Sequence, residues 1–341
     1  MTTVTLGKTG ITVNKNGFGA LPIQRISKED AAYLLKKAFD QGINFFDTAR
    51  AYSDSEEKVG YAFQGIRDKL YIATKTGALN ADDFWKDLHT SLKNLQTDYV
   101  DILQFHNPPF CPRPDDGSGL YEAMLKAKEQ GMIRHISITN HRLHIAKEAI
   151  ESGLYDTLQF PFCYLASDKD IEIVKACEEH NMGFIAMKSL SGGLITNSAA
   201  AYAFAAQYDN VLPIWGIQRE KELDEFLSYI ENPPSMTSEI TDYIETEKKK
   251  LSGSFCRGCG YCMPTCPAKI QINDCARMSL LLRRAPSERF LTPEAQAMMA
   301  KIEDCVHCNV CTTKCPYELN TPELLAENYK DYKEVLAGKP L

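Results

Sequence analysis

The sequence predicts a (β/α)8 barrel followed by a small α-helical domain. Short apolar runs rich in β-branched and aromatic residues recur as far as Trp215, and amphipathic helical patterns lie between them. Strands that alternate with helices in this way are typical of a parallel sheet covered by helices. Composition changes after the last helical pattern, because most of the twelve cysteines fall close together near the C-terminus.

Eight apolar runs predict the barrel strands: Gly17–Ala20, Ile43–Asp47, Leu70–Lys75, Val100–His106, Ile133–Ile138, Thr157–Phe160, Phe184–Met187 and Leu212–Trp215. Helical patterns cover Ser27–Phe39, Glu57–Gln64, Asp82–Leu95, Leu120–Glu129, His144–Glu151, Lys169–His180, Ser198–Tyr208 and Lys221–Ile230. A hairpin over Thr5–Val13 is expected to plug the bottom of the barrel. The active site of such a barrel lies at the C-terminal ends of its strands.

Composition divides the chain into a barrel (1–232), a linker helix (233–254) and a cysteine-rich domain (255–341). The formal net charge of -7 gives no general attraction to nucleic acid or anionic lipid. The N-terminal sequence has no signal-peptide pattern, and no apolar run approaches the roughly 20 residues of a membrane span. We therefore expect a cytoplasmic protein with no nucleic-acid and no membrane partner.

Two cysteine runs repeat the spacing C-x2-C-x2-C-x3-C-P, which is the pattern of bacterial ferredoxins. Three closely spaced thiolates hold three corners of a [4Fe–4S] cube, and the fourth cysteine of each run binds the other cluster. A zinc ribbon is the alternative, which the doubled spacing disfavours. Cluster one is assigned Cys256, Cys259, Cys262 and Cys315, and cluster two Cys305, Cys308, Cys311 and Cys266. The domain resembles α-helical ferredoxin modules with helices around Met278–Arg284 and Pro293–Ile302.

Four cysteines lie outside this pattern. We expect them to be small buried apolar residues, with Cys163 near the barrel mouth: Cys111, Cys163, Cys177 and Cys275.

Three successive predicted strands end on a polar, titratable side chain. These residues are Asp47, Lys75 and His106, and Tyr52 follows Asp47 in the next loop. An isolated Asp–Tyr pair would indicate only a capped turn, but the three strand ends belong at one edge of the barrel. With these four residues in their flanking sequence, the chain resembles the aldo-keto reductases, whose catalytic tetrad is Asp, Tyr, Lys and His in this order.

The resemblance implies a role for each member of the tetrad in reducing a small carbonyl substrate or oxidising the alcohol. Tyr52 would be the general acid that protonates the carbonyl oxygen. Lys75, held by Asp47, would place a positive charge beside the phenol and lower its pKa. His106 would be neutral and donate a hydrogen bond to the developing oxyanion.

The resemblance also implies a nicotinamide site in which Asn140 and Gln159 hold the carboxamide. Met187 stands where many members have a stacking tyrosine, and Glu222 stands where many have an arginine for the 2′-phosphate of NADP. A carboxylate disfavours that phosphate unless Arg219 or Lys221 compensates, so NADH is expected to bind at least as well as NADPH. The expected cofactor contacts are Asn140, Gln159, Met187, Lys188, Leu190, Gly192, Gln218 and Arg219.

The two kinds of centre differ in how they pass electrons. Iron–sulfur clusters pass single electrons, whereas a nicotinamide passes a hydride, so direct exchange needs a converter such as a flavin. Three hypotheses follow. The barrel is an NAD(P)H-dependent carbonyl reductase whose clusters exchange electrons through a flavin or a redox partner protein. Alternatively, it holds FMN with Lys188 at the flavin phosphate and is driven by ferredoxin. In the third, it is a non-catalytic electron-transfer subunit, which the intact tetrad disfavours.

Overall fold

The computed structural model describes residues 2–251, 256–284 and 286–341. The end of the predicted linker, 252–254, and Phe255 lie outside these ranges. By its contacts the chain forms two units: residues up to Leu190 with Ile195–Thr241, and Ser191–Leu194 with residues from Asp242 onward. Helix α9 (Ser238–Leu251) crosses the division at Thr241. The predicted boundaries at 232 and 254 therefore remain predictions.

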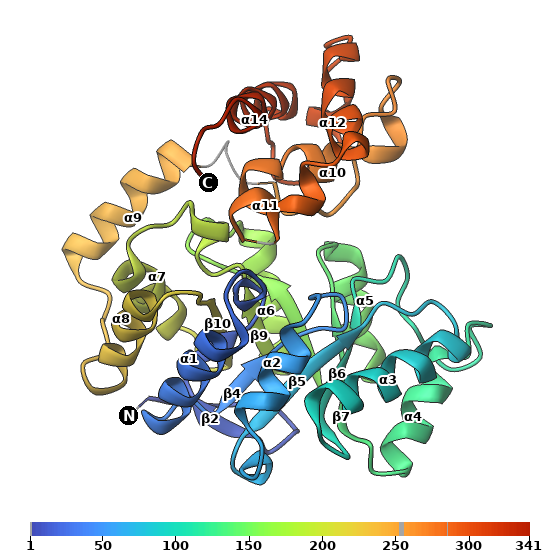
Figure 1. Ribbon diagram of the computed structural model, residues 1–341, viewed down its shortest axis with the longest axis vertical. Coiled ribbons are helices and arrows are strands. Elements are labelled where there is room, and N and C mark those ends of the chain that lie inside the picture. The colour runs from blue at the N-terminus through green and yellow to red at the C-terminus, as the bar shows by residue number, and fades with distance from the viewer. Residues whose placement is uncertain (1, 252–255, 285) are drawn as a thin grey trace. The chain divides into compact units, whose positions relative to one another are not determined.

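Within the described residues, eight parallel strands close into a barrel in the order β10–β3–β4–β5–β6–β7–β8–β9 (Figure 1). This confirms the predicted barrel. The strands are β3 (Gly17–Gly19), β4 (Phe45–Asp47), β5 (Tyr71–Thr76), β6 (Val100–His106), β7 (Ile133–Thr139), β8 (Thr157–Pro161), β9 (Gly183–Met187) and β10 (Val211–Gly216). Their side chains are almost entirely buried, as expected for a parallel sheet covered by helices.

A helix follows each barrel strand. These helices are α1 (Lys28–Asp40), α2 (Ser55–Ala62), α3 (Ala81–Leu95), α4 (Leu120–Glu129), α5 (Leu143–Ser152), α6 (Asp168–Glu179), α7 (Ser198–Ala206) and α8 (Glu220–Glu231). The second begins two residues earlier than predicted. Short 3-10 turns occur at Pro22–Arg25, Arg67–Lys69, Ser191–Gly193, Met263–Thr265, Ser287–Phe290 and Lys301–Asp304. None of the helices in the described ranges is long and apolar enough to cross a membrane.

Polar side chains fix where several barrel helices begin. The Ser27 hydroxyl accepts a hydrogen bond from the Asp30 backbone N–H at 3.0 Å at the start of α1. The Asn80 side chain accepts from the Asp83 N–H at 3.0 Å at the start of α3. Each cap satisfies an N–H that the first turn of a helix leaves unpaired.

The predicted hairpin is present and packs into the barrel. Strands β1 (Thr3–Thr5) and β2 (Thr12–Asn14) pair antiparallel, and Gly7 bridges to Met182 beside the start of β9. Apolar side chains of the hairpin share one core cluster with interior side chains of the barrel: Val4, Leu6, Ile11, Val13, Phe45, Ala73, Ile102, Ile185, Leu212 and Ile214. The hairpin therefore closes the end of the barrel at which the strands begin.

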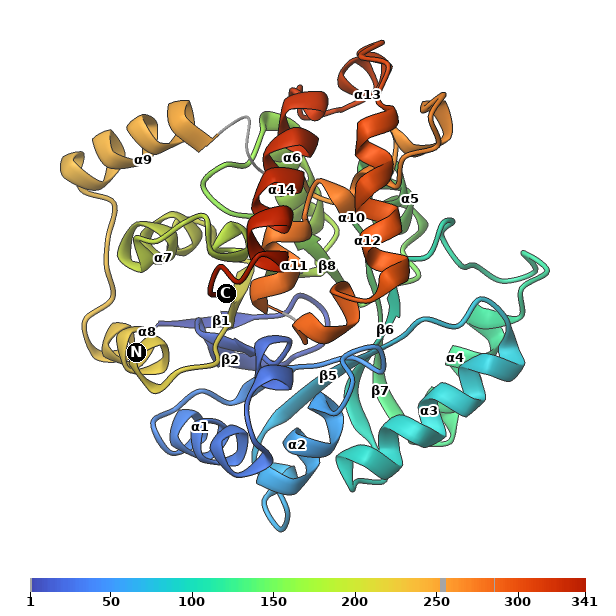
Figure 2. The same ribbon diagram turned by 45° about the horizontal axis from the view of Figure 1, so that its top comes forward.

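The second unit is helical, as predicted. After α9 come α10 (Ile272–Cys275), α11 (Met278–Arg284), α12 (Pro293–Ala300), α13 (Val310–Thr313) and α14 (Thr321–Leu336), and Figure 2 shows α11, α12 and α14 beside one another. Arg283 and Asp331 join α11 to α14 through two hydrogen bonds of 2.8 and 3.0 Å. Helix α14 is not predicted from the sequence. Its buried Leu325, Tyr332 and Val335 belong to the core of this unit, against which six of the run cysteines pack.

Candidate active site and cysteine pockets

The three titratable strand ends lie on neighbouring strands of the barrel. Asp47 is the last residue of β4, Lys75 is near the end of β5, and His106 ends β6. The Lys75 ammonium donates to Asp47 Oδ1 at 2.5 Å and to the Thr48 carbonyl oxygen at 2.7 Å. Asp47 and Lys75 are each only 2% exposed. The pair is therefore a buried ion pair, which needs such close hydrogen bonds to offset the loss of hydration.

Tyr52 lies in the loop after β4, against both Lys75 and His106. The Lys75 Nζ atom is 5.0 Å from the centroid of the Tyr52 ring. The rings of Tyr52 and His106 meet edge to face, with centroids 5.8 Å apart and planes at 83°. Backbone hydrogen bonds from Arg50 to Lys75 and from Tyr52 to Ala49, both 3.0 Å, hold the loop. The fold thus brings all four predicted residues together.

The net pKa shift of Tyr52 differs in direction from the prediction. Burial raises the pKa of the phenol; the Lys75 ammonium lowers it, as predicted, but does not outweigh burial and the Asp47 carboxylate. The sequence identifies the charge that acts on Tyr52 but not how far the folded chain removes the phenol from water. In this structure Tyr52 is therefore protonated at neutral pH, the form that a proton donor requires.

Burial and neighbouring charges also shift the pKa of the other three members of the tetrad. Burial raises the pKa of Asp47, against the opposing effect of Lys75. Burial alone would lower the pKa of Lys75, but Asp47 and Tyr52 together raise it. Burial and the positive charge of Lys75 lower the pKa of His106 to about 3. His106 is therefore a neutral imidazole at physiological pH, as predicted.

Two of the expected cofactor residues have open hydrogen-bonding groups. Both side-chain amide atoms of Gln159 and the Oε1 atom of Gln218 are buried and make no hydrogen bond of normal geometry within the described residues. The Gln159 amide does lower the pKa of Asp47, so it lies close to that carboxylate. Because buried polar groups are nearly always paired, these amides are suited to a polar ligand.

Asn140 is already engaged in its own loop. Its Nδ2 atom donates to the Pro108 carbonyl at 3.0 Å, and its Oδ1 atom accepts from the backbone N–H groups of His141 and Arg142, each at 2.9 Å. Only the second hydrogen of the Asn140 amide remains for a ligand. Its role as a cofactor contact stays a prediction.

The segment after β9 has an unusual backbone. Lys188, Ser191 and Gly192 have positive φ angles of 58°, 48° and 68°. Met187 is partly buried against the interior cluster of the barrel, and Leu190 is also partly buried. The role of Gly192 as a cofactor contact stays a prediction. This glycine groups with the second unit, where Leu280 lies so close that a Cβ on Gly192 would be 1.9 Å from Leu280 Cδ1.

Glu222 caps the start of α8. Its Oε2 atom accepts from the backbone N–H groups of Gln218 at 3.0 Å and Arg219 at 3.2 Å. The Arg219 guanidinium is 3.8 Å from Glu222 Oε1, and its side chain is 71% exposed. The N-terminus of a helix favours an anion, and a carboxylate of the chain already occupies this one.

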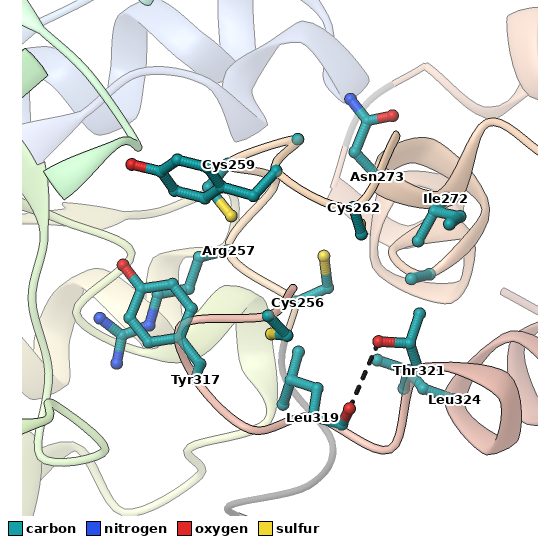
Figure 3. A pocket seen from close by; sticks show the side chains of 14 residues that line it. Cys256, Arg257, Cys259, Cys262, Ile272, Asn273, Tyr317, Leu319, Thr321 and Leu324 are labelled. Atoms are coloured by element: carbon teal, nitrogen blue, oxygen red, sulfur yellow. Dashed lines mark hydrogen bonds between the residues drawn. The ribbon is translucent and has the colours of Figure 1, made fainter. Parts of the chain in front are cut away.

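The eight run cysteines surround two separate pockets in the second unit. Figure 3 shows Cys256, Cys259 and Cys262 around the first, which has a volume of about 380 Å³ and is also lined by Cys315. The second, of about 360 Å³, is lined by Cys266, Cys305, Cys308 and Cys311. The fold thus brings together the two sets expected from the spacing, each with one cysteine from the other run.

Comparison with known proteins agrees with both parts of this description. The aldo/keto reductase family matches residues 15–200, and a 4Fe-4S dicluster domain matches residues 255–320. The chain belongs to the aldo/keto reductase family. Among curated proteins it is 31% identical over 210 residues to L-galactose dehydrogenase of Arabidopsis thaliana, spanning 56% of this chain and 66% of that one, just under two thirds.

Two further proteins illustrate the similarity. Methylglyoxal reductase DkgB of Salmonella typhimurium is 31% identical over 207 residues, covering 56% of this chain and 74% of its own. A solved aldo-keto reductase from Bacillus halodurans, in its holo form, has a TM-score of 0.64 and 20% identity and covers 72% of this chain and 96% of its own. At that identity the solved structure supports the fold alone.

The cysteines of this aldo/keto reductase fall into two chemical groups. Burial raises the pKa of Cys259 and Cys311, and that of Cys262 to about 12. These thiols are therefore protonated without iron, and binding iron must release their protons. The other four cysteines, Cys111, Cys163, Cys177 and Cys275, are buried as predicted.

Two buried polar residues of the barrel are not predicted from the sequence. Gln104 Nε2 donates to Asp47 Oδ2 at 2.9 Å. Glu56 is fully buried; it accepts from the Thr74 hydroxyl at 2.7 Å and forms an ion pair with Arg50. Gln104 has a signal in the sequence, because it is two residues before His106 and so faces the same side of its strand. Glu56 has none, since a glutamate in the first turn of a helix is usually exposed.

We expect the His106 imidazole to remain neutral from pH 8 down to pH 5, because its pKa is lowered to about 3. NMR of 15N-histidine-labelled protein measures the ring nitrogens directly, and the signal is assigned by its loss in His106→Gln. An unperturbed histidine would gain its proton near pH 6.5. A His106 signal that titrated there would contradict the buried, neutral assignment.

Proposed function

We propose that the barrel of this aldo/keto reductase reduces a small carbonyl compound, or oxidises the corresponding alcohol, with a nicotinamide as the hydride carrier. The observation that carries the proposal is the placement of Lys75, which donates to Asp47 at 2.5 Å and lies 5.0 Å from the Tyr52 ring. Burying the ammonium of a lysine between a carboxylate and a phenol lowers the stability of the fold, because the charge loses its hydration. Such a costly arrangement favours a functional role, here in proton transfer from the phenol.

Each residue of the tetrad has a task in this reaction. Tyr52 gives its proton to the carbonyl oxygen while hydride reaches the carbonyl carbon, so the product is an alcohol. Lys75 stabilises the phenolate that forms, and solvent then returns the proton. His106, being neutral, donates a hydrogen bond to the same oxygen. Asp47 keeps Lys75 in place.

The cofactor residues support a nicotinamide in the barrel. NAD(P)H, when bound, supplies the hydride. The buried Gln159 amide, whose two atoms make no hydrogen bond of normal geometry among the described residues, suits a carboxamide, which needs one donor and one acceptor. Gln218 Oε1 offers a further acceptor. Met187 cannot stack on the nicotinamide as an aromatic side chain would at this position. We therefore expect the affinity for nicotinamide to be modest.

The two cysteine pockets support a pair of [4Fe–4S] clusters over zinc. The doubled ferredoxin spacing predicts two cubes, and a 4Fe-4S dicluster domain matches residues 255–320. Two sets of four thiols, each with one cysteine from the other run, line two separate pockets. We propose that these clusters exchange single electrons with a separate redox partner, because a hydride carrier cannot accept them one at a time.

The relatives suggest a class of substrate to test. One is named a dehydrogenase of the sugar L-galactose, and another a reductase of methylglyoxal. Both names refer to small polar compounds. The experiment is an anaerobic assay of the purified protein with methylglyoxal and NADH. Formation of NAD+ in step with the alcohol product supports the proposal. Absence of turnover with every small aldehyde and ketone in a panel, with both clusters intact, would contradict it.

Calorimetric titration should show NADH binding at least as tightly as NADPH, because Glu222 places a carboxylate at the start of α8. Glu222→Gln removes the charge and keeps an acceptor for the helix cap. We expect this variant to improve NADPH binding relative to NADH about twofold to fivefold, the effect of one partly exposed charge.

Glu231→Gln is the matched control, since it removes the same charge from the other end of α8. A clear NADPH preference of the native protein would contradict the role of Glu222. Binding of FMN with neither nicotinamide would favour the ferredoxin-driven flavoenzyme, with Lys188 at its phosphate.

A further inference from the structure

A row of polar side chains crosses the interior of the barrel. Lys75, Gln104, Ser137 and Thr157 are register partners on β5, β6, β7 and β8. Partners in a parallel sheet project to the same face, so these side chains lie side by side. All four are 2% exposed or less. Large branched apolar side chains usually fill the interior of such a barrel, so a buried polar row requires an explanation.

Hydrogen bonds connect this row to the buried carboxylate. Gln104 Nε2 donates to Asp47 Oδ2 at 2.9 Å, while Asp47 Oδ1 accepts from Lys75. Thr157 donates to the Ser137 hydroxyl at 2.6 Å, and Ser137 lies 3.4 Å from Gln104 Oε1. A carboxylate can only accept, so the amide nitrogen of Gln104 must face Asp47. The orientation of the Gln104 amide is thereby fixed.

We propose that Gln104 is a positioning residue that holds Asp47 so that Lys75 stays beside Tyr52. The inference rests on the proposed function of the tetrad. Asp47 has two oxygens, and only one contacts Lys75. Without a donor on the other, the carboxylate can rotate and lose the 2.5 Å hydrogen bond that fixes the ammonium. Among the described residues, Gln104 makes no hydrogen bond to Tyr52 or His106. We therefore infer that it acts through Asp47.

Gln104 also favours the ionised form of Asp47. The titratable groups that face this carboxylate are Lys75 on β5 and Tyr52 in the loop after β4. The charge of Lys75 in turn lowers the pKa of His106 on β6. A hydrogen bond donated to a carboxylate favours its charged form, and both Gln104 and Gln159 lower the pKa of Asp47. Loss of the Gln104 donor raises that pKa. Once Asp47 is protonated, it loses the negative charge that attracts the ammonium of Lys75.

The test is the pH profile of kcat/KM for Gln104→Met, measured with NADH and methylglyoxal. Methionine has a similar volume and cannot donate a hydrogen bond. We expect kcat to fall about tenfold, as for loss of one hydrogen bond to a charged group, and KM to stay within about twofold. The acid limb of the profile is expected to move up by about one pH unit.

Thr157→Val is the matched control, because it removes a buried hydroxyl from the same row without touching Asp47. Its acid limb should match that of the native protein. Gln104→Glu is the second variant: a neutral glutamic acid can donate to Asp47 and an ionised one cannot, so its activity should fall as the pH rises. Circular dichroism and the iron content show that each variant is folded.

An unshifted acid limb in Gln104→Met would overturn the inference, as would an equal shift in Thr157→Val. The activity of Tyr52→Phe tests the proposed function separately. If Tyr52→Phe keeps its activity, the tetrad is not used and the proposed function fails. If Tyr52→Phe is inactive while the limb of Gln104→Met does not move, only the role of Gln104 is wrong.

Discussion

Replacing Tyr52 with phenylalanine is expected to lower kcat for carbonyl reduction on the order of 10²–10⁴-fold, since a positioned proton donor supplies that much. Only the hydroxyl is lost, and the ring keeps its edge-to-face contact with His106. Binding of NADH and the iron content should therefore be unchanged. Steady-state rates with methylglyoxal, together with calorimetry for NADH, measure both quantities.

Tyr61→Phe is the control for this substitution. Tyr61 also has a lysine against its ring, with Lys28 Nζ 4.0 Å from the ring centroid, but it lies on the outer helix α2. Its variant should keep the native rate. If Tyr52→Phe also turned over at nearly the native rate, the tetrad would have no catalytic use in this chain.

Cys266→Ser is expected to remove the cluster held by the second cysteine run, although Cys266 belongs to the first run. The pocket that Cys266 lines is formed by Cys305, Cys308 and Cys311. The intact protein should contain about eight irons per chain, and the variant should lose up to half of them. Zinc in place of iron would contradict the account of both pockets.

Reference variants show which cluster is lost. Cys259→Ser alters the first pocket, and Cys308→Ser alters the second. The EPR spectrum of each dithionite-reduced variant should therefore show only the cluster in the unaltered pocket. The spectrum of Cys266→Ser should match that of Cys308→Ser. A match to Cys259→Ser would show that the crosswise assignment is wrong. Cys275→Ser is the control, since Cys275 is buried in the same unit but lines neither pocket.

The parts of the site that follow from strand order could be predicted from the sequence. Parallel strands place their carboxyl ends at one edge, so Asp47, Lys75 and His106 had to lie near one another once their strands were recognised. The two sets of cysteines likewise follow from a repeated spacing. Both inferences depend on local patterns of residues, which the sequence contains in full.

Properties that depend on burial could not be predicted in this way. Lys75 acts on Tyr52 in the expected direction, yet burial decides the net shift of the phenol pKa. Asn140 is predicted from the sequence as a cofactor contact. In the fold its amide already forms hydrogen bonds with the Pro108 carbonyl and two backbone N–H groups. The contact between Gly192 and Leu280 joins residues far apart in the chain. Each outcome is set by tertiary neighbours that no local pattern identifies.

Direct hydride transfer between a nicotinamide and the substrate carbon is the central claim. The most direct measurement is one anaerobic turnover of methylglyoxal with NADH that carries deuterium at both C4 positions, followed by mass spectrometry of the alcohol. Transfer in the barrel, with Tyr52 supplying a proton from solvent, predicts one deuterium on the carbon that bears the new hydroxyl. Product without deuterium would show that the electrons reach the substrate through a flavin or the clusters, and would contradict the account.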